Sequence, residues 1–276
     1  MRAVIRAIIG LCPGFVRVIQ AHRSILVKKY SALGNRYWVL PFEDSIQGGD
    51  VVRLCSGAAS DGVLIGARVC ENFSLRIFNA DGSEAKISGN GTRIFAAHLA
   101  RLGHVATGTA FPIMTPHGNV LCTVHRFTGQ NYDVSADLEI CSCETAYTWH
   151  LDGKTPLMGY RVDLGNPHFI LSPDDSRAHA TLLKHVAQSP NWVPTAANVH
   201  LLQMVDARNI FVRSWERGVG PTASCGSGAC GCAFVAHHFY GYRAAIGVHM
   251  PGGDLGVKVF GRRVTIRGPI KFEQGM

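Results

Sequence analysis

Short runs of residues in which apolar and polar positions alternate, or in which apolar positions are continuous, recur along most of the chain and predict β-strands. The predicted strands are residues 24–27, 63–67, 74–78, 113–116, 119–124, 161–163, 199–205 and 210–215. Gly118 lies between two of them and predicts a hairpin turn. Residues 79–82 (NADG) are a strong turn signal after another strand. Both halves of the chain are therefore expected to be rich in strands.

Two longer segments, 93–102 and 229–240, have a helix-like pattern. Each is followed by a glycine, Gly103 or Gly241, which is typical of a helix C-terminus. Residues 142–158 are rich in turn-forming and charged residues and are predicted to be the linker between two α/β halves.

The two helix-like segments follow stretches that are near copies of each other, residues 87–92 (ISGNGT) and 224–229 (SCGSGA). In each, a small nucleophilic side chain, Ser88 or Cys225, precedes Gly-x-Gly. Asn79 and Glu216 stand nine residues before these two positions, and the tripeptide Leu-Gly-Asn occurs at 33–35 and again at 164–166. Three matched landmarks in the same order predict an internal duplication whose halves face each other across a cleft.

The chemistry of this motif is that of an anion-binding helix start. Glycines let the backbone approach a ligand closely, and the unpaired N–H groups at a helix N-terminus bind a carboxylate. The same positive helix end is expected to lower the pKa of a thiol placed there, such as that of Cys225. Two facing units would hold one carboxylate from both sides, with an acid or base on each face of the neighbouring carbon. Such a site could remove the α-proton of an amino acid from one face and return it to the other.

Eight segments resemble the signature of the diaminopimelate epimerase family, in order and with sensible spacing, from about residue 28 to the C-terminus. They are residues 30–35 (YSALGN), 78–84 (FNADGSE), 89–93 (GNGTR), 165–168 (GNPH), 215–218 (WERG), 225–230 (CGSGAC), 250–255 (MPGGDL) and 267–269 (RGP). The resemblance implies an α+β fold of two pseudo-symmetric domains, each a strand-rich, barrel-like roll around a central helix. We expect an N-terminal extension over 1–27, a first epimerase-like domain over 28–145 and a second over 155–276.

The resemblance also implies an amino-acid isomerase that needs no cofactor and no metal, and diaminopimelate epimerase in lysine and peptidoglycan precursor synthesis is the activity it favours. Cys225 and Ser88 occupy the two catalytic positions. The residues expected to bind substrate are Asn35, Asn79, Gly89, Asn90, Asn166, Asn198, Glu216, Arg217, Gly226 and Ser227. Asparagine at the end of a turn or strand is also common for backbone reasons alone. His168 is expected to be structural or to support the site indirectly.

The chain departs from the family at two positions. The family uses two cysteines, and Ser88 stands where the first would be. A serine hydroxyl ionises far less readily than a thiol, and a helix end contributes only up to about 2 kcal/mol. Pro221 replaces an acidic residue that is usual before the second motif. These changes leave open a single-thiol dehydratase or isomerase of another amino acid, a non-catalytic amino-acid-binding paralogue, and a Cys-to-Ser variant that traps substrate.

Composition and charge agree with a globular enzyme that acts on a small-molecule substrate. The 276 residues are 47% apolar and 17% charged, which favours two well-packed domains. The net charge is +8, but residues 1–36 contain seven Lys and Arg and no acidic residue, so the remainder carries 20 basic against 19 acidic residues, or +1. A nearly neutral body argues against a nucleic-acid partner. No apolar stretch reaches membrane-spanning length.

The nine cysteines predict neither a metal site nor disulfides. The pairs Cys141/Cys143 and Cys230/Cys232 have the wrong spacing for zinc, and no histidine pair completes a set. An odd count without a clean secretion signal fits a reducing compartment, so a cytoplasmic protein is expected. A small amino acid is the expected partner, and the sequence leaves a homodimer open.

Overall fold

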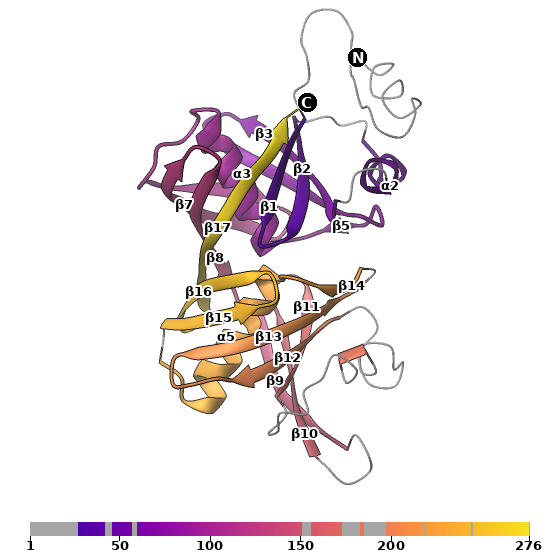
Figure 1. Ribbon diagram of the computed structural model, residues 1–276, viewed down its shortest axis with the longest axis vertical. Helices are drawn as coiled ribbons and strands as arrows, with labels where there is room; N and C mark the ends of the chain where they lie inside the picture. The colour runs from indigo at the N-terminus through magenta and orange to yellow at the C-terminus, as the bar shows by residue number, and fades with distance from the viewer. Residues whose placement is uncertain are drawn as a thin grey trace, which may run out of the picture.

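The computed structural model describes residues 27–41, 46–56, 60–150, 156–172, 183–184, 197–217, 219–243 and 245–275. They form two lobes along the long axis of the molecule, with one helix inside each (Figure 1). Of the predicted strands, 24–27 falls almost entirely outside the described residues. The others are confirmed, with bounds that differ by a few residues.

The first lobe is a closed barrel of eight strands in the order β1, β2, β3, β4, β6, β7, β8, β17 and back to β1. The elements from this half of the chain are β1 (Lys28–Ala32), β2 (Asn35–Pro41), α2 (Gly48–Ser56), β3 (Gly62–Val69), β4 (Asn72–Asn79), β5 (Glu84–Ala85), α3 (Gly89–Arg101), β6 (Ala110–Thr115), β7 (Gly118–Thr128) and β8 (Asn131–Glu139).

The second half of the chain repeats this order around α5. Its elements are β10 (Pro156–Asp163), β11 (Pro167–Ser172), β12 (Asn198–Met204), β13 (Asn209–Glu216), β14 (Gly220–Thr222), α5 (Gly226–Tyr240), β15 (Ala245–Met250), β16 (Gly253–Phe260) and β17 (Arg263–Gly275), and β9 (Ser142–His150), which continues β8 of the first half, pairs with β10. The parallel pairs β2/β3 and β4/β6 are matched by β11/β12 and β13/β15. This correspondence confirms the internal duplication that the matched motifs predicted and the barrel-like fold that the family resemblance implied.

The two halves exchange their last strands. The start of β17 pairs with β16, but its end pairs with β1, where Phe272 lies opposite Tyr30 and Gly275 opposite Lys28. In the same way β9 follows β8 directly and pairs with β10 of the second lobe. The predicted linker over 142–158 is therefore wrong, because its first nine residues form a strand. Of the residues that suggested a loop, Glu144 lies within β9 and Pro156 begins β10, whereas Asp152 and Gly153 lie outside the described residues.

The central helices are buried because their side chains fill the barrels. In α3, Ile94, Ala96 and Ala97 have no exposed surface. A Cβ built on Gly66 of β3 would lie 2.0 Å from Cε2 of Phe95, so a glycine is needed there for the ring to pack. Burying an isoleucine or phenylalanine contributes about 1.5–3 kcal/mol. The same packing in α5 involves Ala229, Cys230, Ala233 and Val235.

The helix ends agree with the sequence analysis in most respects. Gly241 is the C-cap of α5 in the left-handed conformation, with φ 72°. Gly103 also has a positive φ, 74°, but lies one residue beyond the C-cap of α3, Leu102. Both helices begin earlier than predicted, at Gly89 and Gly226, because the glycine motifs themselves form the first helical turn.

Candidate active site

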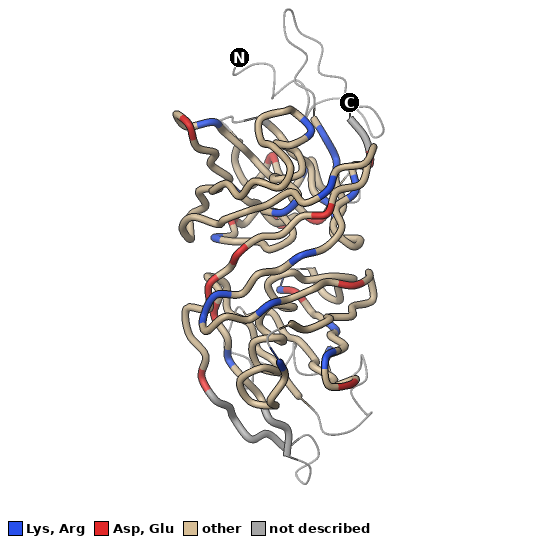
Figure 2. Tube along the Cα trace, turned by 90° about the vertical axis from the view of Figure 1, so that its left-hand side faces the viewer, with Lys and Arg blue, Asp and Glu red and all other residues tan. Residues whose placement is uncertain are grey.

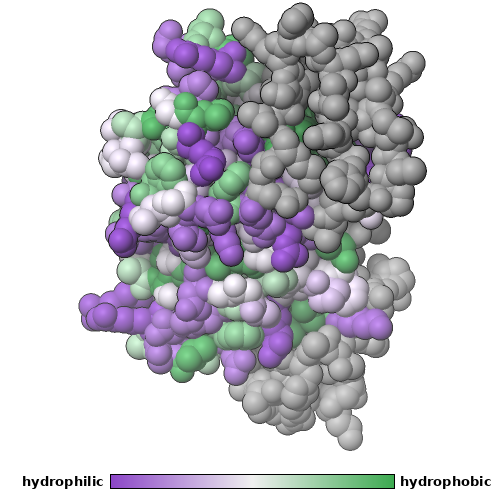
Figure 3. Space-filling model, turned by 45° about the horizontal axis from the view of Figure 1, so that its top comes forward, coloured by the Kyte–Doolittle hydropathy of each residue, from purple (hydrophilic) through white to green (hydrophobic). Residues whose placement is uncertain are grey.

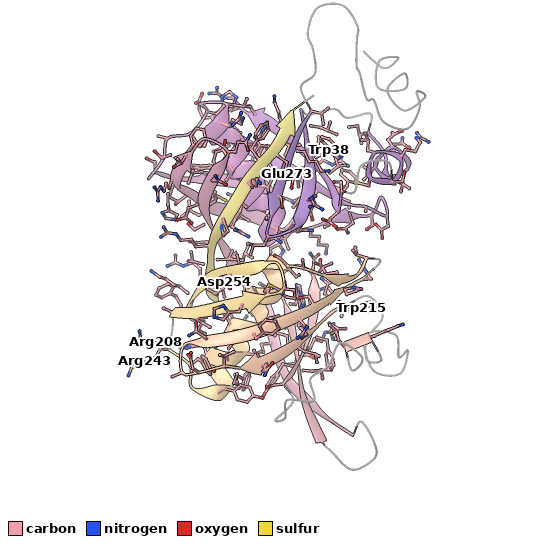
Figure 4. All side chains as sticks on the ribbon, viewed as in Figure 1. Trp38, Arg208, Trp215, Arg243, Asp254 and Glu273 are labelled. Atoms are coloured by element: carbon pink, nitrogen blue, oxygen red, sulfur yellow. The ribbon has the colours of Figure 1, made fainter. Side chains whose placement is uncertain are left out.

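The N-termini of α3 and α5 meet between the lobes. A Cβ built on Gly89 would lie 3.1 Å from the carbonyl carbon of Gly226, and one built on Gly226 would lie 2.8 Å from Oδ1 of Asn90. The two helix starts therefore touch through backbone that only glycine allows. Side chains of both lobes occupy the space between the ribbons at this level (Figure 4).

Ser88 and Cys225 are the N-cap residues of these two helices, in matching extended conformations. Ser88 has φ −147° and ψ 119°, and its Oγ accepts a 3.0 Å hydrogen bond from the N–H of Gly91. Cys225 has φ −128° and ψ 107° and makes no side-chain capping bond; its Sγ lies 3.7 Å from Oγ of Ser227. The equivalence predicted for residues 88 and 225 thus extends to their backbone geometry.

The pKa of the Cys225 thiol is shifted in the direction opposite to the one expected from its position at a helix N-terminus. Its side chain is buried, with 4% of the residue exposed. Burial first, and the nearby Glu216 carboxylate second, raise the pKa of Cys225 well above its ordinary value, whereas hydrogen bonds from Gly228 and Ser227 lower it. Desolvation of the thiolate thus acts against the lowering expected from the helix end.

Glu216 lies close to this thiol. Its Oε1 accepts a 2.8 Å hydrogen bond from Oγ1 of Thr222. Burial raises the pKa of the Glu216 carboxyl to about 7, against the lowering effect of hydrogen bonds from Thr222 and Cys225. A carboxyl with this pKa can take up and release a proton at neutral pH.

A hydrogen-bond network joins the two helix starts. Nδ2 of Asn90 donates to Oδ1 of Asn35 at 3.2 Å and to Oγ of Ser224, next to Cys225, at 3.1 Å. Oδ1 of Asn90 accepts from Arg93 at 2.7 Å. Arg93 is completely buried, and this burial lowers its pKa to about 10. The sequence analysis left Arg93 out of the site; the structure makes it the support of Asn90.

Asn166 reaches the site from the second lobe. Its Nδ2 donates a 2.7 Å hydrogen bond to the carbonyl oxygen of Ile87, the residue before Ser88. Together with Asn35 and Asn90, it belongs to the predicted residues that the fold gathers around the two N-caps.

Asn79 ends β4, Asn198 begins β12, and Arg217 lies in the turn after β13. Nδ2 of Asn79 donates to Oγ of Ser83 at 3.0 Å, and Oδ1 of Asn198 accepts from the backbone N–H of Arg217 at 3.0 Å. Hydrogen bonds from Ser83 lower the pKa of the Asp81 carboxyl in the first lobe, and the charge of the exposed Arg217 adds a smaller lowering effect. Among the contacts of the described residues, none joins these three side chains to Ser88 or Cys225. Trp215 precedes Glu216 where β13 meets β14 (Figure 4).

Tyr37 is a site residue that the sequence analysis missed. It is 5% exposed on β2, two residues after Asn35 and hence on the same face of the strand. Burial and the Glu216 charge raise the pKa of Tyr37, while hydrogen bonding with Ser88 lowers it. Its phenol therefore lies beside Ser88. Its spacing of two residues from Asn35 within one strand was the signal that could have identified it.

The fold also brings together three possible metal ligands that sequence spacing did not connect. His168, His200 and Cys225 each offer one donor atom, and these atoms lie within 4.8 Å of one another. Nδ1 of His168 is 2.8 Å from Nε2 of His200, whose Nδ1 is 2.8 Å from Oγ of Ser214. Both histidines are completely buried, and burial lowers the pKa of His168 to about 4.

Charged and hydrophobic residues are mixed over the surface of the described parts of the protein. Basic and acidic residues alternate along the described parts of both lobes (Figure 2), and hydrophobic residues on the face in Figure 3 stand in small groups among hydrophilic ones. Within the described residues, every helix falls short of the length and apolar character needed to cross a bilayer.

Comparisons with known proteins agree with this geometry. The model of the family described as diaminopimelate epimerase matches residues 160–273. A diaminopimelate epimerase of Geobacillus thermodenitrificans is 32% identical over 263 residues, 84% of this chain and 88% of that protein. One from Rhodococcus opacus is 34% identical over 198 residues, 69% of this chain and 67% of that protein.

Solved structures show the same fold. A predicted epimerase from Pseudomonas aeruginosa superposes with a TM-score of 0.67 at 17% identity, covering 92% of this chain and 98% of that one. A probable proline racemase from Agrobacterium radiobacter gives 0.59 at 14% identity, covering 92% and 91%. At these identities the likeness concerns the fold alone.

Proposed function

Because the chain belongs to the diaminopimelate epimerase family, a family of amino-acid epimerases, we propose that it interconverts LL- and meso-diaminopimelate without pyridoxal phosphate. The observation that carries this proposal is the contact between the N-termini of α3 and α5, with Ser88 and Cys225 as their N-caps.

The α-carboxylate binds to the paired helix starts. Backbone N–H groups of Gly89, Asn90, Gly226 and Ser227 belong to the first turns of α3 and α5, where they lack intrahelical partners. A carboxylate between them is attracted by two positive helix ends, which also stabilise the negative charge that develops when the α-proton leaves.

Cys225 removes or returns the α-proton on one face. Its thiol first gives its proton to Glu216, whose pKa of about 7 suits an acceptor at neutral pH. The thiolate then takes the proton from the α-carbon, and the electron pair of the broken C–H bond remains on the substrate. The carboxylate of the substrate and the surrounding dipoles hold this charge without bulk water.

Ser88 acts on the opposite face. Its Oγ is already an acceptor for the N–H of Gly91, so its own hydrogen is available to the substrate. Tyr37 lies beside it and can resupply that proton. The Ser88 hydroxyl is a weaker acid than a thiol, and its alkoxide forms far less readily than a thiolate. Proton transfer on the face of Ser88 is therefore expected to limit the rate.

The distal end of diaminopimelate carries a second carboxylate and ammonium. Arg217 is exposed on the turn after β13 and can bind this carboxylate through two parallel N–H groups. Asn198 fixes the Arg217 backbone, and Asn79 fixes the facing turn near Asp81.

The test is incubation of the protein with LL- or meso-diaminopimelate in deuterated water. Deuterium at the α-carbon with mixing of the two stereoisomers supports the epimerase. The presence of Ser88 favours a second candidate, a single-thiol enzyme with altered chemistry, which would exchange the α-proton of one stereoisomer without inverting it. Binding without exchange would contradict both.

A further inference from the structure

We propose that Cys225, His168 and His200 form a binding site for a thiophilic divalent cation of the zinc class. His168 and His200 stand on the neighbouring parallel strands β11 and β12, and Cys225 caps α5 above them. One donor atom from each lies within 4.8 Å of the other two, and all three residues are buried.

The donor set suits such a cation. One thiolate and two imidazoles are typical ligands of Zn²⁺, at about 2.3 Å for sulfur and about 2.0–2.1 Å for nitrogen. In a tetrahedral site these lengths place sulfur about 3.6 Å from each nitrogen. The sulfur therefore needs to approach the nitrogens by at most about 1.2 Å, which rotation of the Cys225 side chain can supply, and the two nitrogens, 2.8 Å apart, need to separate by about 0.5 Å. Three protein ligands leave the fourth position for water.

The surroundings of His200 resemble those of a metal-binding histidine. Its Nδ1 is held by Oγ of Ser214 at 2.8 Å, which fixes the ring and turns Nε2 toward His168. Histidine ligands are commonly oriented by such a hydrogen bond on the second nitrogen. A Cβ on Gly228 would lie 2.2 Å from Cε1 of His200, so the ring fits only because residue 228 of α5 is glycine.

The protons balance on cation binding. Without a cation, one hydrogen is shared between the facing nitrogens of His168 and His200, 2.8 Å apart. To bind the cation, both His168 Nδ1 and His200 Nε2 must be free of hydrogen. The hydrogen of the neutral His200 ring is then on Nδ1, which faces Ser214, and that of the neutral His168 ring is on Nε2. The latter atom is buried and has no hydrogen-bond partner among the described residues. The rings stay neutral, and the Cys225 thiol releases its proton to water, one proton for each cation bound.

Binding of the cation would hold the Cys225 sulfur and prevent it from carrying the α-proton. Inhibition by zinc is therefore the expected consequence, and this consequence alone rests on the proposed function. The binding itself depends only on the three side chains.

Co²⁺ is the probe that tests the site, because a thiolate ligand gives it a sulfur-to-cobalt charge-transfer absorption. The parent protein for this titration is the Cys141→Ser variant. Cys141 Sγ and His117 Nε2 lie 3.4 Å apart on the surface, so this pair would compete for Co²⁺. Titration is expected to saturate at one Co²⁺ with a tetrahedral spectrum, and excess Mg²⁺ should not displace it. Cys225→Ser should abolish the charge-transfer band.

Two further variants locate the ligands. Ser214→Ala removes the support of His200 and should weaken Co²⁺ binding about 10- to 100-fold, and His200→Gln should weaken it further. The matched control is His125→Gln, which removes a histidine–serine pair of the same length (Nε2 of His125 to Oγ of Ser135, 2.8 Å) in the first lobe. It should bind Co²⁺ like the parent. Circular dichroism checks folding, and Ser214→Ala decides the matter if His200→Gln does not fold.

A charge-transfer band that survives Cys225→Ser, or full affinity in Ser214→Ala, overturns the site. Absence of the band in a protein that epimerises diaminopimelate defeats this inference and leaves the proposed function standing. A normal Co²⁺ spectrum in a protein without isotope exchange defeats the proposed function only.

Discussion

Asn166 of the second lobe donates a 2.7 Å hydrogen bond to the carbonyl of Ile87 in the first lobe, one residue before the N-cap Ser88. This bond couples the position of the Ser88 backbone to the turn between β10 and β11. We expect Asn166→Ala to lower kcat by about 2- to 10-fold, since loss of this part-buried hydrogen bond costs about 0.5–1.5 kcal/mol. Steady-state kinetics with LL-diaminopimelate measure this. Asn119→Ala, on the exposed part of β7, is the control and should leave kcat unchanged.

Ser88→Cys should increase epimerisation by about 10²-fold, the usual scale of a positioned acid or base. The reason is that a thiol ionises within reach of neutral pH, whereas a serine hydroxyl does not. The rate of deuterium appearance with inversion is the measurement. Equal rates for the variant and the parent protein would show that Ser88 does not face the α-carbon.

Tyr37→Phe should lower epimerisation about tenfold or more in the native background, because it removes the hydroxyl that supplies Ser88. In a Ser88→Cys background the same change should have little effect, since the thiol needs no relay. The comparison of the four proteins is a double-mutant cycle. An identical loss in both backgrounds would assign Tyr37 a purely structural role.

Glu216 should give the activity an acid limb near pH 7, because its pKa is about 7 and its ionised form accepts the thiol proton. Glu216→Gln should lower kcat/KM and remove this limb from the pH profile. A limb that persists at the same pH in the variant would mean that another group titrates.

The Glu216 carboxyl should also make the free energy of unfolding depend on pH. This energy should fall with rising pH, whereas the activity should rise. The pKa of this carboxyl in the folded protein lies above that of an ordinary glutamate, so the folded state binds more protons between about pH 4.5 and 7. Its contribution to the free energy of unfolding is greatest below this window and falls as pH rises through it. Glu216→Gln should lose this slope, which thermal unfolding at pH 5 and pH 8 can measure.

Gly66→Ala should lower the free energy of unfolding by about 1–3 kcal/mol, because the added methyl would overlap the ring of Phe95 inside the first barrel. Urea denaturation measures the change. Gly49→Ala is the matched control: nothing lies within 4 Å of its Cβ position, and alanine favours the α2 helix, so stability should stay the same or rise slightly. Comparable losses in both variants would exclude packing against Phe95 as the cause.

The sequence predicted the repeat and the two helix starts because these depend on local signals, and Asn35, Asn90 and Asn166 of the candidate site lie beside those starts. Glycine after Ser88 and Cys225 marks the helix N-termini directly. The exchange of β9 and β17 could not be predicted, since pairing between strands far apart in the chain leaves no local pattern. His200 and Arg93 were missed for a related reason: a buried polar residue among apolar neighbours looks like any strand or helix position until its partner is placed beside it.

The strand exchange has a consequence for how the protein can be divided and how it can move. β9 continues from β8 of the first half and pairs with β10 of the second lobe, and the end of β17 pairs with β1 of the first lobe. Neither half expressed alone would therefore contain all the paired strands of its lobe. Because β17 runs from one lobe into the other as a single strand, movement of one lobe relative to the other has to bend this strand.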